Sequence, residues 1–306
     1  MVRDLRILGV RTDPPEILYD PATFVSSPFV VRPLAAHPDR LYQPIVITAR
    51  TCVPGPDARC AADGPAEGTA MADRDTDAAL LLQVEPEVLR AALAADPLAG
   101  YGGVRVLLEV VARGPDGAVA RASKTLVFSP DVPGLVPNHG LEVRGFAVFH
   151  GVKRQNVRPG FEVDLNVADA VTLRPLLASG AGGARPDEEY DTVDLSGRPV
   201  HLREHISYSF YATPHAQYGR LLRQDPGADV ADEPGPLDPQ PPQGLVRLNA
   251  TGQGAGRAWV VARDGRGAEA FSFLDFVFLD QRQCATLLPN GTLLTSHCEQ
   301  LEVICQ

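Results

Sequence analysis

Basic residues, lysine above all, are scarce in this sequence, and long apolar runs are missing. The 28 Lys and Arg residues are outnumbered by 38 Asp and Glu, which gives a formal net charge of −10. Surfaces for nucleic acid or an anionic membrane need clustered Lys and Arg, so the composition argues against both kinds of partner. No run of 18 apolar residues occurs, which argues against a transmembrane helix.

Low-complexity sequence is scarce as well. Glycine and proline, 28 of each among 306 residues, stay below the roughly 25–30% typical of a disordered chain. The hydrophobic share of 44% is large enough to build a folded core. At roughly 100–200 residues per domain, the length predicts about two domains.

The five cysteines form no CxxC pair, which excludes the usual zinc-ribbon and thioredoxin spacings. Cys52 and Cys60 flank residues 53–59, a segment with two prolines and a glycine that turns easily. Because such a segment brings its ends together, we predict a disulfide that clamps this loop. Five reduced thiols are the alternative, although paired cysteines fit an oxidising compartment better.

A second cysteine pair lies near the C-terminus. Cys284 and Cys298 stand symmetrically about Asn290-Gly291, a dipeptide typical of tight hairpin turns. We therefore predict that they pair across a short hairpin in a C-terminal extension at 282–306. A bond from Cys305 to either of them stays open.

The N-terminus contains no apolar segment of the kind that forms a signal peptide. The protein is therefore either cytoplasmic or exported with its signal removed. Because disulfides persist outside the reducing cytoplasm, the cysteines favour the exported protein. The expected location is therefore periplasmic, outer-membrane-anchored or extracellular.

Alternation of apolar and polar residues, rather than helical spacing, dominates the chain. Phe161–Val167 and His205–Thr213 alternate cleanly, as half-buried strands do. One short helix is expected at 86–95, where Pro86 stands near the start. The other expected strands are 5–18, 44–49, 104–111, 118–128, 141–148, 258–263 and 268–279.

Turn-forming and polar stretches separate these strands. Residues 129–140 hold three prolines and two glycines and are predicted to be a linker between domains. Residues 178–198 and 214–244 are expected to be long exposed loops. Loops on a rigid scaffold often carry the recognition residues of a protein, so these two are the candidate binding segments.

An internal repeat divides the chain. Residues 110–128, aligned without gaps on 260–278, give nine identities in 19 positions, including a shared Val-Val-Ala-Arg. Each half therefore closes with the same pair of strands. Short strands, proline-rich turns and almost no helix predict an all-β protein of two tandem Ig-like antiparallel β-sandwich domains. The predicted domains are 1–133 and 138–281, followed by the short hairpin extension.

Three segments carry a resemblance to a known group of proteins. Leu5–Glu16 resembles the opening strand of Ig-like domains in uncharacterised surface lipoproteins of high-GC Gram-negative bacteria. Ser207–Thr213, followed by Trp259–Gly267, is similar to their later domain, in which an aromatic strand and a hairpin turning at Asp-Gly-Arg-Gly recur. The resemblance implies an exported, lipid-anchored β-sandwich protein without a known catalytic role. This sequence departs from that group because it lacks a lipobox cysteine at the N-terminus.

His201-Leu202-Arg203-Glu204-His205 matches H-x-x-E-H, the inverted zinc-protease motif. Zinc chemistry there needs both histidines on one helical face, with the glutamate activating water. Here the motif follows a Gly-Arg-Pro-Val segment and runs directly into an expected strand, which favours a solvated strand start. A zinc-dependent hydrolase is kept as the less favoured alternative, and neither a metal site nor a cofactor is predicted.

Four aromatic residues are candidate binding residues. Tyr208, Tyr211, Tyr218 and Trp259 carry rings able to stack on sugars, although such a set is also typical of core and edge packing in a sandwich. We expect a non-enzymatic exported protein that acts in binding or assembly through its long loops, with a carbohydrate-binding module as the alternative. The expected partner is another envelope or surface protein, a second copy of the chain, or a glycan.

Overall fold

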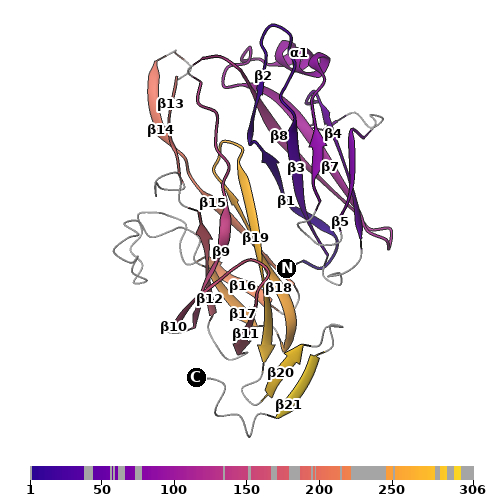
Figure 1. The fold of residues 1–306 in the computed structure, drawn as a ribbon, viewed down its shortest axis with the longest axis vertical. Coiled ribbons are helices and arrows are strands. Elements are labelled where there is room, and N and C mark those ends of the chain that lie inside the picture. Colours follow the sequence, from indigo (N-terminus) through magenta and orange to yellow (C-terminus); the bar gives the residue numbers. More distant parts are fainter. Residues whose placement is uncertain are drawn as a thin grey trace.

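A computed structural model describes most of the chain. The described residues are 2–37, 44–55, 57, 59–60, 66–72, 78–133, 135–150, 153–166, 171–178, 187–193, 196, 198–213, 216–221, 246–250, 252–279, 283–287 and 293–297. In this part, the regular structure is β-strand except for one short helix, and the strands form the two sandwiches of Figure 1. The prediction of an all-β fold built from β-sandwich domains is confirmed.

The first sandwich packs a three-stranded sheet against a five-stranded sheet. The smaller sheet has the order β1 (Arg6–Asp13), β3 (Phe29–Ala36), β6 (Leu80–Leu82). The larger has the order β2 (Glu16–Tyr19), β8 (Val119–Pro130), β7 (Val104–Arg113), β4 (Ile45–Cys52), β5 (Gly68–Ala72). On β4, Ile45, Ile47 and Ala49 are buried and the residues between them are not, which is the alternation that makes a half-buried strand.

The second sandwich packs a five-stranded sheet against a four-stranded sheet. The first of these has the order β10 (Lys153–Val157), β9 (Val143–His150), β12 (Val171–Leu177), β17 (Val246–Ala250), β16 (Ala216–Leu221). The second has the order β11 (Glu162–Asn166), β19 (Glu269–Leu279), β18 (Gly254–Arg263), β15 (Ser207–Ala212). Two separate hairpins complete the fold, β13 (Glu189–Val193) with β14 (Pro199–Arg203) and β20 (Gln283–Leu287) with β21 (Leu293–His297).

One sheet of each sandwich repeats the same strand order. The series β2-β8-β7-β4 and β11-β19-β18-β15 both begin with a parallel pair and continue with antiparallel pairs. The repeated sequence is therefore the central hairpin of each series, β7–β8 and β18–β19. The two parallel pairs depart from purely antiparallel pairing. In the first sandwich, Pro14-Pro15 explains the departure, because proline cannot donate to a ladder and the chain crosses there from β1 to the other sheet.

The helix α1 (Pro86–Ala95) connects β6 to β7, as the sequence predicts. It begins with a proline in its first turn, where the missing N–H has no partner to lose. Its buried residues are Leu89 and Ala92, which belong to the core of the first sandwich.

Two stretches expected as loops contain strands. β13 lies inside 178–198, and β16 lies inside 214–244. The alternation on β13 escapes notice because Glu189 and Asp191 make the segment strongly polar, although they occupy only one face of the strand. The remainder of the second stretch, 214–215 and 222–244, lies outside the described residues.

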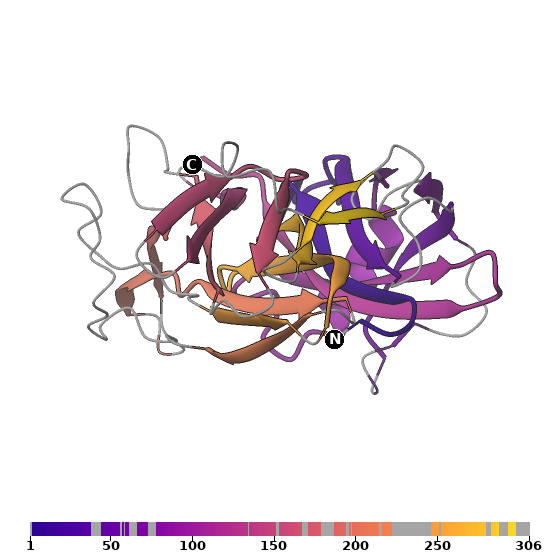
Figure 2. The ribbon, with the colours of Figure 1, turned by 90° about the horizontal axis from the view of Figure 1, so that it is seen from below.

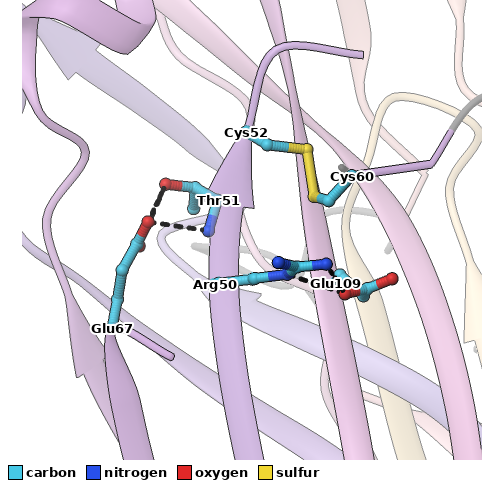
Figure 3. The surroundings of a disulfide bond; sticks show 6 residues. All are labelled: Arg50, Thr51, Cys52, Cys60, Glu67 and Glu109. Carbon is cyan, nitrogen blue, oxygen red and sulfur yellow. Dashed lines mark hydrogen bonds and ion pairs between the residues drawn. A yellow bond between two sulfur atoms is a disulfide. The ribbon is translucent and has the colours of Figure 1, made fainter. Parts of the chain in front are cut away.

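The disulfide predicted between Cys52 and Cys60 is confirmed. It joins the end of β4 to the segment that follows, with a Cα–Cα distance of 5.7 Å. Figure 3 shows Arg50 directed across to Glu109 on β7, and the two side chains form an ion pair of 2.6 Å. A disulfide such as Cys52–Cys60 is typical of proteins outside the reducing cytoplasm.

The C-terminal hairpin is present as β20 and β21, which pair antiparallel. Its register places Ser296 opposite Cys284. Cys298 and Cys305 lie outside the described residues, and so does the Asn290-Gly291 turn. A disulfide between Cys284 and Cys298 stays a prediction.

Candidate functional site at the joint between the sandwiches

Three apolar clusters, rather than two, hold the described part of the chain together. One lies inside each sandwich, and a third joins them. The third consists of Val2, Leu8, Leu34 and Ala36 from the first half with Trp259 and Val261 from the second. We call this cluster the joint. Figure 2 shows the two sandwiches side by side, with the N-terminus lying between them.

Strand β18 supplies the second half's share of the joint because it is buried on both faces. Six consecutive residues, from Arg257 to Ala262, are buried. Val260 and its alternate neighbours point into the sandwich core, while Trp259 and Val261 point into the joint. Trp259 is only 1% exposed, which makes it one of the largest fully buried side chains.

Strand β1 supplies the other side through a bulge. Its pairing with β3 shifts register between Ile7 and Gly9, and the shift sends Leu8 to the joint although Val10 packs in the sandwich core. A side chain on Gly9 would begin only 3.1 Å from Cγ1 of Val261. Any side chain at this position would therefore force Val261 to shift, so glycine suits this close approach of β1 to β18.

A first set of polar groups borders the joint. The Lys124 ammonium donates to the carbonyl of Val10 at 2.8 Å, and the Val10 amide donates to the Glu269 carboxylate at 2.7 Å. Lys124 and Glu269 are 3.8 Å apart, and Arg263 also binds Glu269. Burial lowers the pKa of Lys124, although the carboxylate of Glu269 acts in the opposite direction. Residues from both sandwiches thus satisfy one another's charges across the boundary.

A second set surrounds Arg266, in the turn between β18 and β19. The guanidinium lies 3.1 Å from Glu204, 3.6 Å from Glu16 and 3.8 Å from Glu188. It also covers the ring of Tyr190, with its Cζ 4.1 Å from the ring centroid. We call these five residues the Arg266 cluster.

Asp264 fixes the turn that carries Arg266. Its Oδ1 accepts hydrogen bonds from the amides of Arg266, Gly267 and Ala268 at 2.8–3.0 Å. Its Oδ2 accepts from the side-chain Nδ2 of Asn138 at 2.6 Å, and the backbone amide of Asn138 donates to the Glu16 carboxylate at 2.7 Å. The linker is therefore held to both sandwiches.

The H-x-x-E-H motif is divided between two environments. His201 lies on β14, where its Nδ1 is 2.8 Å from Asp191. The carboxylates of Asp191 and Glu189 raise the pKa of His201. Glu204 lies just beyond the strand in the Arg266 cluster, with a side chain only 2% exposed. Burial raises the pKa of Glu204, with Asp264 and Glu188 adding to the shift. In the described residues no three His, Cys, Asp or Glu side chains form a group able to hold a metal ion.

The hairpin β13–β14 has two different faces. Glu189 pairs with Arg203 and Asp191 with His201, so one face carries cross-strand ion pairs. Tyr190 stands opposite Leu202 on the other face, and Leu202 is 44% exposed. Figure 1 shows the hairpin set apart from the second sandwich, at the end of the molecule where β2 and α1 lie.

The candidate aromatic residues do not form one surface. Trp259 is inside the joint and Tyr211 packs partly against it, while Tyr208 packs on the core of the second sandwich and stacks on Phe210. Burial raises the pKa of Tyr208. The side chain of Tyr218, on β16, lies outside the described residues. Trp259 therefore does not present its ring to solvent, because two sandwiches rather than one enclose it.

Sequence reasoning missed the polar groups of the joint. Arg266 and Asp264 stand out only as a hairpin turn, and Lys124 only as one of two lysines. The signal available in the sequence was the uninterrupted apolar run on β18, where Val-Val-Ala directly follows the tryptophan.

Among the described residues no helix has the length and apolar character needed to cross a membrane.

No family model matches this chain, and no curated protein matches its sequence. Solved structures similar to it include the periplasmic chaperone SfaE, at 11% identity over 89% of this chain and 100% of that chain, with a TM-score of 0.27. Fibronectin(III)-like modules of Clostridium thermocellum CbhA match at 8% identity over 90% of this chain and 96% of that one, with a TM-score of 0.22. Red sea bream transglutaminase matches at 9% identity and a TM-score of 0.25 over 90% of this chain, which spans only 32% of the transglutaminase chain. TM-scores this low carry no argument about activity or partner.

Proposed function

We propose that this is a non-enzymatic protein of the cell envelope or cell surface that acts in binding or assembly. The observation that carries the proposal is the joint, in which Trp259 and Val261 are buried against β1 and β3 of the other sandwich. A joint of this kind holds two sandwiches at one distance and angle. Rigid presentation favours binding because less conformational entropy is lost when the partner docks.

The hairpin β13–β14 is the binding element that we propose within the described residues. Two of its residues are open to solvent, with Asp191 88% exposed at its side chain and Leu202 44% exposed. A two-stranded ribbon also has two edges on which a partner's strand can add. The partner that suits such a ribbon is another protein. The disulfide between Cys52 and Cys60 supports a periplasmic or extracellular setting.

Site-specific photo-crosslinking in the native cells tests this function. A benzophenone amino acid replaces Leu202 on the hairpin or, as a matched control, Val119, which is 46% exposed on β8 of the first sandwich. We expect a discrete protein adduct from position 202 and none from position 119. Absence of an adduct at 202, or the same adducts at both positions, would contradict the proposal. Binding of the purified protein to a glycan array, without a protein adduct, would replace it with the carbohydrate-binding alternative.

A further inference from the structure

Arg266 contacts three parts of the chain that are distant in sequence. It lies between Gly265 and Gly267, both with positive φ, in a turn held by Asp264. From there its guanidinium meets Glu16 at the start of β2 and Glu204 at the end of the hairpin. The first sandwich and the hairpin therefore meet through a side chain that belongs to neither.

The Arg266 cluster places one guanidinium among several carboxylates. Glu16, Glu188 and Glu204 have side chains only 12%, 32% and 2% exposed, and Asp264 adds a fourth carboxylate. His139 also lies at this place, with its Nδ1 2.8 Å from Glu188 and its side chain 66% exposed. Without the guanidinium, carboxylates from the two sandwiches would face each other with little water to screen them.

The hairpin has little packing of its own. A two-stranded ribbon is marginally stable in isolation. Its base is closed by the Glu204 amide, which donates to the Glu188 carbonyl at 2.9 Å, and by the Glu188 amide, which donates to the Glu204 carboxylate at 3.0 Å. Tyr190 is covered by the guanidinium itself. The ribbon therefore contacts the same guanidinium that pairs with Glu16 at the start of β2.

We propose that Arg266 is a latch that couples the position of the hairpin β13–β14 to β2 of the first sandwich. Loosening the contact on the side of the first sandwich loosens the hairpin, and loosening the hairpin loosens β2. The coupling is reciprocal because the hairpin and β2 both contact the same guanidinium. It is a property of the free protein and does not depend on whether the hairpin binds a partner.

Hydrogen–deuterium exchange with mass spectrometry tests the latch through Glu16→Gln. Glu16 reaches the hairpin through Arg266 and also through the linker, where it accepts from the backbone amide of Asn138 and the next residue, His139, contacts Glu188. An effect on residues 189–203 therefore reports the latch only where Arg266→Gln reproduces it. We expect exchange across 189–203 to rise about fivefold or more in this variant. The matched control is Glu109→Gln, which breaks a similarly enclosed ion pair with Arg50 on the outer face of the same sandwich. The control should leave 189–203 unchanged.

Arg266→Gln completes the test from the centre of the latch. Exchange should rise in both the hairpin and β2, while the amides shared by β4 and β7 keep their protection. Arg266→Lys keeps the charge but loses the planar contact with Tyr190. Its exchange rates should therefore lie between those of the native protein and those of Arg266→Gln. In Arg266→Gln, faster exchange in the hairpin without faster exchange in β2 would overturn the proposal. In Glu16→Gln, faster exchange in β2 without any in the hairpin would also overturn it. So would an equal response of the hairpin to Glu109→Gln.

Discussion

At the scale of single residues, the joint concentrates its burial on Trp259, the one tryptophan of the chain. Replacing Trp259 with Ala removes an indole that both sandwiches enclose and leaves a cavity between them. We expect the free energy of unfolding to fall by about 3–5 kcal/mol, as for other large buried aromatic residues. Urea denaturation followed by far-UV circular dichroism measures the change. Val119→Ala, at an exposed site, should change it by about 0.5 kcal/mol or less. A loss in Trp259→Ala as small as that control would contradict burial at the joint.

Glu204 makes a pH-dependent contribution to stability. Because its folded pKa lies above the unfolded value of about 4.3, the folded protein binds this proton more tightly than the unfolded chain does. This contribution is therefore present below the unfolded pKa and is lost as the pH rises through the folded pKa. Glu204→Gln cannot titrate, so the stability of the native protein relative to this variant should rise as the pH falls through that window.

Urea midpoints of the two proteins between neutral pH and pH values near the unfolded pKa measure the effect. Titrating groups that do not interact with Glu204 cancel in the difference between the curves. A constant difference across the range, or one that shrinks on acidification, would show that the folded pKa of Glu204 is not above its unfolded value.

At the scale of the element, the disulfide closes a short loop at the end of β4. Its two cysteines are separated by 8 positions, and a loop of that size predicts a stabilisation of about 2–3 kcal/mol from restriction of the unfolded chain. Replacing Cys52 and Cys60 together with Ser should lower the free energy of unfolding by that amount. The fold should be unchanged, because the alternation on β4 is independent of the bond.

The same variant tests the remaining cysteines. A reductant should destabilise the native protein, and it should destabilise the double variant further only if a second disulfide exists among Cys284, Cys298 and Cys305. An unchanged unfolding curve for the double variant compared with the oxidised native protein would contradict a stabilising role for the loop clamp.

Elements whose pattern is local could be predicted from the sequence, and those shaped by distant contacts could not. The hairpin β7–β8, the helix α1 and the paired cysteines at 52 and 60 each depend on residues close together in the chain. The strand β13 was missed because charge on one face conceals the alternation. The joint was missed for a different reason, since periodicity assigns a strand one buried face and β18 has two.

At the scale of the whole molecule, two sandwiches that share an apolar cluster and buried charges should unfold together. Each sandwich has a core of its own, which by itself would allow the two to melt independently. However, Lys124 of the first sandwich and Glu269 of the second are both largely enclosed where the sandwiches meet. Separation would expose these charges and the apolar side chains at once. The native protein should therefore show one cooperative thermal transition, and tryptophan fluorescence and circular dichroism should report the same midpoint.

Gly9→Val should separate that single transition into two. The new side chain would overlap Val261, whose Cγ1 lies 3.1 Å from the position of its Cβ, and it would do so outside both sandwich cores. We expect the sandwiches to move apart, Trp259 to become exposed with a red-shifted emission, and each core to melt separately in calorimetry. Gly252→Val is the matched control, since nothing lies within 4 Å of the added Cβ there. A single transition with unshifted emission in Gly9→Val would mean that the joint yields without opening, and the rigid scaffold on which binding is proposed would lose its support.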